Sequence, residues 1–186
     1  MHILTLEDPI EYLHPSQRAL VSQRQVGIDT SSFAEGLRAA LREDPDIILV
    51  GEMRDPETIS LALTAAETGH LVFATLHTRD TSSAISRILD SLPVNQQHQA
   101  RNQLSEALEV VVTQHLHKRV DQPGRVASFE VLVCSDAVRN LIRQDKLHEI
   151  ANVLQTNKKS GMQTMQTALH ALELEGLIAP SEVAVP

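Results

Sequence analysis

The chain has 186 residues, 42% of them hydrophobic and 22% charged, and a formal net charge of −8. This composition is that of one globular domain, or of one domain with an appendage, and excludes a disordered chain. The negative charge excludes a broadly basic surface for nonspecific nucleic-acid binding, although a local basic patch remains open. No apolar run is long enough to cross a bilayer, and the lone cysteine, Cys134, excludes an internal disulfide.

The first half of the chain alternates between apolar strands and amphipathic helices. Strands are predicted at 2–6, 47–50 and 71–76. The 47–50 segment is a continuous apolar run, typical of a strand buried on both faces in a parallel sheet, and the 71–76 strand is also predicted to be buried. Residues 17–28 are interpreted as a loop or hairpin. The order of strands and helices predicts a parallel sheet with right-handed crossovers. The predicted helices run from Ser31 or Ser32 to about Arg42, from Asp55-Pro56 to Gly69, and from Thr81 or Ser82 to about Leu92.

The second half has a different character. Residues 95–116 predict a long amphipathic helix, and residues 118–133 predict a hairpin that turns at Gln122-Pro123-Gly124. Three helices and a frayed tail at 179–186 are expected to follow. We therefore predict an α/β core at residues 1–93 and a helical C-terminal region, with a β-hairpin, at residues 94–186. The three helices are predicted at 136–146, 147–156 and 161–175.

Side chains able to carry out chemistry follow each predicted strand. Glu7, Asp8 and Glu11 come after the first strand, Glu52 after the second and His77 after the third. Because parallel strands end at one edge of the sheet, we expect these groups to converge in one crevice. Carboxylates suit Mg²⁺ and can orient a water for attack on a phosphoryl group, and a histidine can neutralise developing charge.

Other interpretations of this edge remain open. Each group could instead form a separate salt bridge with a nearby arginine at a solvent-facing edge. A metal-dependent hydrolase that uses the same residues without a nucleotide is a further alternative. A zinc site is a weaker one, because His70 and His77 bracket a single predicted strand and cannot share a metal.

Several segments resemble the motifs of the motor ATPases of type IV pili and type II secretion. Thr5–Glu11 (TLEDPIE) is similar to the Asp box, Leu37–Asp55 (LRAALREDPDIILVGEMRD) to the Walker B segment, and Thr68–Thr78 (TGHLVFATLHT) to the His box, in the family's order. Ala137–Gln144 (AVRNLIRQ) resembles the C-terminal motif of the pilus retraction branch, the PilT-like proteins. The resemblance covers nearly the whole chain. It implies a RecA-like P-loop NTPase fold, assembled into a hexameric ring at the cytoplasmic face of the inner membrane.

The resemblance implies roles for the residues at matching positions. Glu11 would help to place the attacking water, and Glu52 would act at Mg²⁺ and that water. His77, with His70, would lie near the γ-phosphate of ATP. Gly51 stands where other Walker B segments have aspartate, as it does in this family, so the metal would depend more on Glu52, the P-loop hydroxyl and water.

The remaining charged residues of the boxes are candidates for nucleotide binding or subunit contacts. Glu7, Asp8 and Arg54 are predicted to bind the nucleotide. The arginines Arg42, Arg54 and Arg87 could neutralise phosphate charge or contact a neighbouring subunit. The alternative, which stays open, is that they form structural ion pairs with Glu43, Asp55 and Asp90.

The predicted helix at 136–146 carries a candidate interaction surface. By resemblance, its motif is needed for pilus retraction and contacts other ring or membrane components, such as an inner-membrane platform protein. A plain amphipathic helix with a solvated basic face is the alternative. The residues of this surface are Arg139, Asn140, Leu141, Ile142 and Arg143.

The sequence contains no G-x-x-x-x-G-K-[ST] segment, and its seven glycines form no phosphate-cradling loop. In the resembled family this loop and its central strand precede the Asp box, so we expect a gap between the strand ending at Glu52 and the strand ending at His77. We therefore expect a fragment of a motor ATPase, arising from truncation or a broken reading frame, that alone neither binds ATP tightly nor hydrolyses it. The alternative is a non-catalytic interaction module that co-assembles with intact ATPase subunits.

Overall fold

The computed structural model describes residues 1–180, apart from the side chain of Lys158. The chain forms two compact units, described separately below. One contains Met1–His77 and Ile88–Ala107, and the other contains Thr78–Arg87 and the residues from Leu108 onward. The predicted division into domains at residue 93 stays a prediction, and residues 181–186 of the predicted frayed tail lie outside the described residues.

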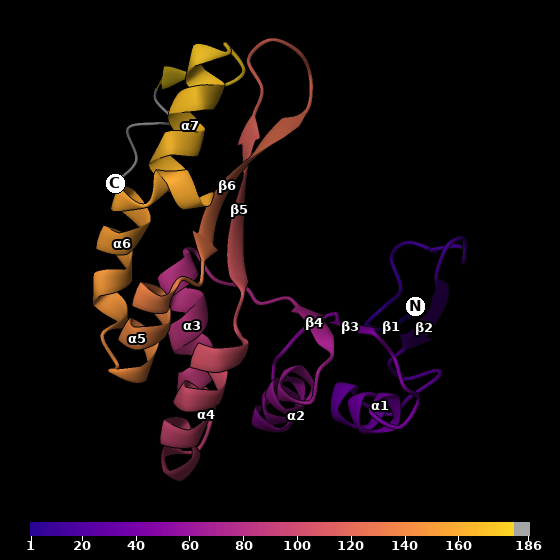
Figure 1. Ribbon diagram of the computed structural model, residues 1–186. Coiled ribbons are helices and arrows are strands. Elements are labelled where there is room, and N and C mark those ends of the chain that lie inside the picture. Colours follow the sequence, from indigo (N-terminus) through magenta and orange to yellow (C-terminus); the bar gives the residue numbers. More distant parts are fainter. Residues whose placement is uncertain (181–186) are drawn as a thin grey trace. The chain divides into compact units, whose positions relative to one another are not determined.

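The first unit is built on a parallel sheet with strand order β2-β1-β3-β4 (Figure 1). β1 (His2–Glu7), β3 (Ile47–Val50) and β4 (Leu71–Ala74) confirm the predicted strands. The predicted loop or hairpin at 17–28 is wrong, because β2 (Leu20–Gln25) pairs in parallel with β1. Its polar residues concealed the strand, which lies at the edge of the sheet where polar side chains are tolerated.

β3 and β4 are direct neighbours in this sheet. They pair in parallel from Ile47 opposite Leu71 to Val50 opposite Ala74. The expected gap between the strands ending at Glu52 and His77 is therefore wrong. Within the described residues β4 is instead the last strand of the sheet, and it is not buried as predicted, since Phe73 is 53% exposed.

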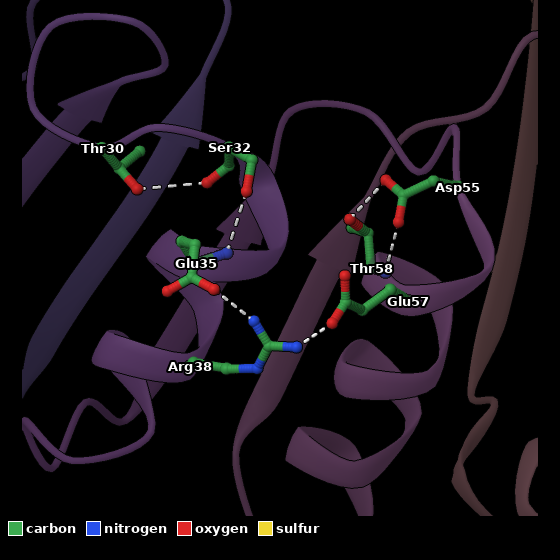
Figure 2. Close-up of polar contacts among 7 residues, drawn as sticks. All are labelled: Thr30, Ser32, Glu35, Arg38, Asp55, Glu57 and Thr58. Atoms are coloured by element: carbon green, nitrogen blue, oxygen red, sulfur yellow. Dashed lines mark hydrogen bonds and ion pairs between the residues drawn. The ribbon is translucent and has the colours of Figure 1, made fainter.

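The two helices that cover the sheet begin at side-chain caps, as predicted. α1 (Phe33–Ala40) follows Ser32, whose hydroxyl accepts a hydrogen bond from a first-turn N–H at 3.1 Å. α2 (Pro56–Glu67) follows Asp55, whose carboxylate accepts from the Thr58 N–H at 2.9 Å and from its hydroxyl at 2.7 Å (Figure 2). Each cap satisfies N–H groups that the helix itself leaves without a partner.

An ion pair network links the exposed surfaces of these helices. The Arg38 guanidinium on α1 lies between the carboxylates of Glu35, on the same helix, and Glu57, on α2 (Figure 2). Because all three side chains are exposed, the network adds little to the free energy of unfolding.

α1 and α2 lie on the same face of the sheet, and the core of the first unit lies between (Figure 1). The prediction that β3 is buried on both faces is wrong, because its alternate residues Ile47 and Leu49 point to the other face and are only half-buried. A hollow of about 520 Å³ opens on that other face, and its lining includes Ile3, Leu49 and Phe73. The fully buried residues on the helix-covered face are Leu4, Leu6, Ile48 and Val50, packed with Leu37, Ala40 and Ala65.

α3 (Thr81–Asp90) confirms the predicted helix, and α4 (Val94–Ala107) follows it. The predicted long helix over 95–116 is wrong in its second half, because β5 (Val110–Lys118) begins there. The run of β-branched residues at the start of this segment, Val110 to Thr113, favours a strand over a helix.

The second unit contains an antiparallel hairpin and several helices. β5 pairs with β6 (Arg125–Val133), which confirms the predicted hairpin, and α7 (Met165–Leu174) packs on β6 (Figure 1). The three predicted helices are present, although the last begins later than expected. None of the described helices is long and apolar enough to span a bilayer. The elements after β6 are α5 (Asp136–Arg143), η1 (Leu147–Glu149), α6 (Ile150–Thr156), η2 (Lys158–Ser160) and α7 (Met165–Leu174).

Candidate active site at the carboxyl edge of the parallel sheet

The centre of the candidate site is the carboxylate of Glu52, which follows β3. Its Oε2 lies 2.5 Å from an Arg54 guanidinium nitrogen, and its Oε1 lies 3.4 Å from Nε2 of His77, which follows β4. The Glu52 side chain is only 16% exposed, whereas the side chains of Arg54 and His77 are mostly exposed. The sheet therefore holds one sheltered carboxylate between two solvent-facing basic groups.

The partners of Glu52 set its charge. The hydrogen bond from Arg54 is the main cause that lowers the pKa of Glu52, and the nearby charges of Arg54 and His77 lower it further, while burial acts in the opposite direction. In return, Glu52 raises the pKa of Arg54, with a smaller contribution from the charge of Asp8. Glu52 is therefore an ionised hydrogen-bond acceptor at neutral pH.

Gly51 places Glu52 through contacts of its backbone. Its N–H donates to the Leu6 carbonyl at 2.7 Å, and its own carbonyl accepts a hydrogen bond from the Thr75 hydroxyl. A Cβ at this position would lie 2.9 Å from the Leu6 carbonyl oxygen and 3.3 Å from the Glu7 Cα. The close approach of β1 therefore requires glycine directly before Glu52.

Glu7, at the end of β1, belongs to a polar network with β2. Its Oε1 accepts a hydrogen bond from the Thr5 hydroxyl at 2.6 Å and another from the Gln23 amide at 2.9 Å. The structure therefore fixes Glu7 against β2 and gives it no direct contact with Glu52.

Glutamine side chains of β2 also hold the loop that follows β1. The Gln23 amide donates to the Tyr12 carbonyl at 2.9 Å and accepts from the His14 N–H at 2.7 Å, and Gln25 accepts from the Ile10 N–H at 3.2 Å. The Asp8–Pro9 peptide bond in this loop is cis. Glu11 lies exposed on the same loop, and its assignment as the residue that places the water stays a prediction.

The structure brings some of the predicted residues together and separates others. Glu52, Arg54 and His77 are in contact, and Asp8 acts electrostatically on Arg54. His70 precedes β4, where its ring nitrogen lies 2.9 Å from the Ala65 carbonyl oxygen at the end of α2. His70 precedes β4 and His77 follows it, so the two rings lie at opposite ends of that strand.

Sequence reasoning named Arg54 but missed its pairing with Glu52, and it missed Gln23 and Thr75 altogether. Arg54 pairs with Glu52, whereas Asp55, its alternative partner, caps α2. Gln23 could have been found only by noticing that it shares one side of a strand with Gln25, and that strand was interpreted as a loop or hairpin. Thr75 gave no signal, because its partner Gly51 is distant in sequence.

The residues present fit one side of a magnesium–nucleotide complex. The Glu52 carboxylate oxygens can coordinate Mg²⁺ or accept hydrogen bonds from its bound waters, and His77 beside them can face a phosphate charge. The described residues hold no cluster of three or more His, Cys, Asp or Glu side chains able to grip a metal by themselves. The sequence also lacks the loop that would cradle the phosphates. The residues present therefore suit the metal and the attacking water, but not the phosphate groups.

The candidate interaction helix, α5, has an inward face and an outward face. Val138 and Ile142 are fully buried, and Leu141 is half-buried. Arg139 is half-buried and pairs with Glu109 at 2.8 Å, whereas Arg143 is exposed. The two arginines of the motif therefore have different environments.

A parallel sheet with a sheltered glutamate at its carboxyl edge, followed by a hairpin and helices, is the arrangement of a RecA-like ATPase domain. Residues 1–123 match the family model described as type II/IV secretion system protein, and the chain belongs to that family.

Curated relatives agree with this assignment. The chain is 57% identical over 179 residues to a twitching motility protein of Neisseria gonorrhoeae, covering 96% of this chain and 48% of the relative. It is 53% identical over 178 residues to the type IV pilus retraction ATPase PilT of Pseudomonas aeruginosa, covering 96% of this chain and 52% of the relative. The chain thus spans about half the length of these relatives.

Solved structures share the fold. A crystal structure of the pilus retraction motor PilT with bound ADP matches with a TM-score of 0.89 and 49% identity, covering 98% of this chain and 51% of that one. The ATPase DotB of Legionella pneumophila matches with a TM-score of 0.86 and 32% identity, covering 98% of this chain and 50% of that one. These matches confirm the predicted RecA-like sheet and the C-terminal region with its hairpin.

Proposed function

We propose that the chain supplies the water-activating half of a hexameric motor ATPase that drives type IV pilus retraction at the inner face of the cytoplasmic membrane. Its similarity to pilus retraction ATPases over nearly its whole length supports the biological process. The ATP and Mg²⁺ of this reaction would be held jointly with a phosphate-binding loop from outside these 186 residues. The platform protein of the pilus machine is its proposed membrane partner.

The observation that carries this proposal is the setting of Glu52. An ionised, sheltered carboxylate at the carboxyl edge of a parallel sheet can accept a hydrogen bond from a water and orient it for attack on a phosphoryl group. His77, whose Nε2 lies 3.4 Å from the same carboxylate, is proposed to respond to the charge that develops on the phosphoryl group. Glu11 is proposed to help place the water from the loop after β1.

The chain alone is proposed to be inactive, because nothing in its sequence replaces the phosphate-cradling loop. Calorimetry with Mg²⁺-ATP and a phosphate-release assay on the purified 186-residue chain test this directly. We expect neither measurable binding at micromolar nucleotide nor turnover. Micromolar affinity, or Mg²⁺-dependent hydrolysis by this chain, would overturn the proposal of a half-site.

The role of Glu52 is tested in a chimera that joins the N-terminal half of the gonococcal relative to this chain. Glu52→Gln keeps the shape of the side chain and removes its charge, and we expect kcat to fall by about 10²–10³-fold with ATP binding retained. Glu67→Gln, an exposed change of the same kind on α2, is the matched control. Equal kcat values in the two variants would contradict the role of Glu52.

The α5 motif is proposed to act in retraction and not in ATP binding. Arg143 is the more exposed of the two arginines, whereas Arg139 is half-buried and pairs with Glu109. In the chimera, Arg143→Ala should leave ATP turnover unchanged and reduce twitching. Normal twitching by this variant would favour a plain amphipathic helix.

A second candidate function is a non-catalytic module that co-assembles with intact ATPase subunits. It is favoured by the open face of the sheet, where Leu49 and Phe73 line a hollow. Co-purification of the tagged chain with a full-length relative, together with a change in that relative's ATPase rate, would support this function. ATP hydrolysis that appears only when this chain is covalently joined to a phosphate-binding loop would instead support the first function, half of a motor ATPase.

A further inference from the structure

Both oxygens of the Glu52 carboxylate, which the proposed reaction needs for a water, already have basic neighbours in the first unit. A guanidinium nitrogen of Arg54 lies 2.5 Å from Oε2, and Nε2 of His77 lies 3.4 Å from Oε1. A carboxylate accepts hydrogen bonds from metal-bound water through these same two oxygens. The water therefore has to compete with side chains of the chain itself.

Arg54 is the closer of the two neighbours and the stronger competitor. An arginine stays charged throughout the pH range of proteins, and its hydrogen bond to a carboxylate is of the strong, charge-assisted kind. Its positive charge also opposes the approach of a divalent cation to Glu52. Arg54 and a metal with its waters therefore compete for one carboxylate oxygen.

The side chain of Arg54 can end this competition without a movement of the backbone. On one side of it the Met53 N–H donates to the Thr75 carbonyl at 3.2 Å, and on the other side Asp55 caps α2. The Arg54 side chain is 65% exposed, whereas that of Glu52 is 16% exposed. A long side chain in solvent changes rotamer freely, so Arg54 is the movable partner and Glu52 the fixed one.

We propose that Arg54 is a latch on Glu52: without phosphate it occupies Oε2, and the phosphates of a nucleotide draw the guanidinium away and free that oxygen for water. Phosphate oxygens match the guanidinium fork as carboxylate oxygens do. The proposal rests on the proposed function, since it takes Glu52 as the residue that orients the water. It adds a form of regulation, because Glu52 becomes available only once phosphate has arrived.

Manganese binding to the 186-residue chain without nucleotide tests the latch. Mn²⁺ is used as a paramagnetic probe in place of Mg²⁺, and Mn²⁺ bound at Glu52 broadens the ring C–H resonances of His77 beside it. We expect half-broadening in Arg54→Gln at an about fivefold lower Mn²⁺ concentration than in the unmodified chain, the upper range for an exposed ion pair.

Two further variants show whether this gain is specific. Arg18→Gln removes the same charge at another exposed position of the first unit and should leave the Mn²⁺ concentration unchanged. Glu52→Gln combined with Arg54→Gln should abolish the gain, because the carboxylate is gone. Equal Mn²⁺ concentrations for Arg54→Gln and the unmodified chain would overturn the latch, and so would a gain that persists in the double variant.

Release by phosphate needs its own measurement. Sulfate, a tetrahedral dianion like phosphate, is the probe, and chloride at equal ionic strength is its control. We expect sulfate to narrow the difference in Mn²⁺ concentration between the unmodified chain and Arg54→Gln, since it draws Arg54 from Glu52. An equal difference in sulfate and in chloride would overturn the release. No ATP is hydrolysed here, so these outcomes are separate from a failure of the proposed function, which Glu52→Gln in the chimera reveals.

Discussion

Replacement of Gly51 by alanine gives a sharp test of how the site is built. The added Cβ would lie 2.9 Å from the Leu6 carbonyl oxygen and 3.3 Å from the Glu7 Cα. Both atoms belong to the backbone of β1, so neither can rotate away as a flexible side chain could. Relief requires β1 and β3 to separate by a few tenths of an ångström, which stretches the 2.7 Å hydrogen bond between Gly51 and Leu6.

The cost follows from these contacts. Overpacking of a tight site costs about 1–3 kcal/mol. Alanine also restricts the unfolded chain, which returns about 0.4–1 kcal/mol. We therefore expect Gly51→Ala to lower the free energy of unfolding by about 1–2 kcal/mol, as measured by urea denaturation.

The same substitution should change the charge of the site. A shift of Gly51 moves Glu52 away from Arg54, and the pKa of Glu52 should then rise, since the Arg54 hydrogen bond is the main cause that holds it low. A ¹³C NMR titration of the Glu52 carboxyl measures this. The control is Gly124→Ala, where φ is +125° and no atom crowds the Cβ, so stability falls through backbone strain alone. A Gly51→Ala protein with unchanged stability and unchanged Glu52 pKa would refute the argument from close approach.

Three further predictions concern other parts of the molecule. Arg54→Gln should raise the pKa of Glu52. In the unmodified chain, the stability that comes from the low pKa of Glu52 is present above the ordinary value of 4.5 and is lost as pH falls through the lower folded value. Acid unfolding of the two proteins, followed as a function of pH, measures the difference. Burial raises the pKa of Cys134 to about 11 from 9.0, so stability should decrease by roughly 2–3 kcal/mol as pH rises from 9 to 11, and a thiol reagent at pH 8 should label the thiol only after denaturant is added. Asp55→Ala should cost about 1–2 kcal/mol in urea denaturation, because it removes the cap of α2, whereas Ser31→Ala beside the cap of α1 should cost little; equal losses would contradict the capping argument.

The sequence predicts the elements that local signals specify. The apolar run of β3 and the Asp55-Pro56 start of α2 are such signals, and both elements occur where expected. β2 was missed because its polar residues at the edge of a sheet resemble a loop. The helix expected over 95–116 stops at Ala107, since Val110 and its β-branched neighbours prefer the extended conformation.

The candidate site was predictable in outline. Parallel order places the ends of β3 and β4 at one edge, and Glu52 and His77 do meet there. The pairing of Arg54 with Glu52 instead of Asp55 depends on loop geometry. The need for glycine at position 51 depends on how closely β1 approaches, which is a property of tertiary packing and not of local sequence.

The exposed β4 has a consequence for handling the protein. β4 lies at the edge of the described sheet and carries the exposed Phe73, so it offers unpaired backbone groups and an apolar side chain to any similar strand nearby. Pairing of this edge with a different edge of another copy would not close on itself, so aggregates could keep growing. We therefore expect aggregation of this chain to increase with its concentration and with temperature during expression.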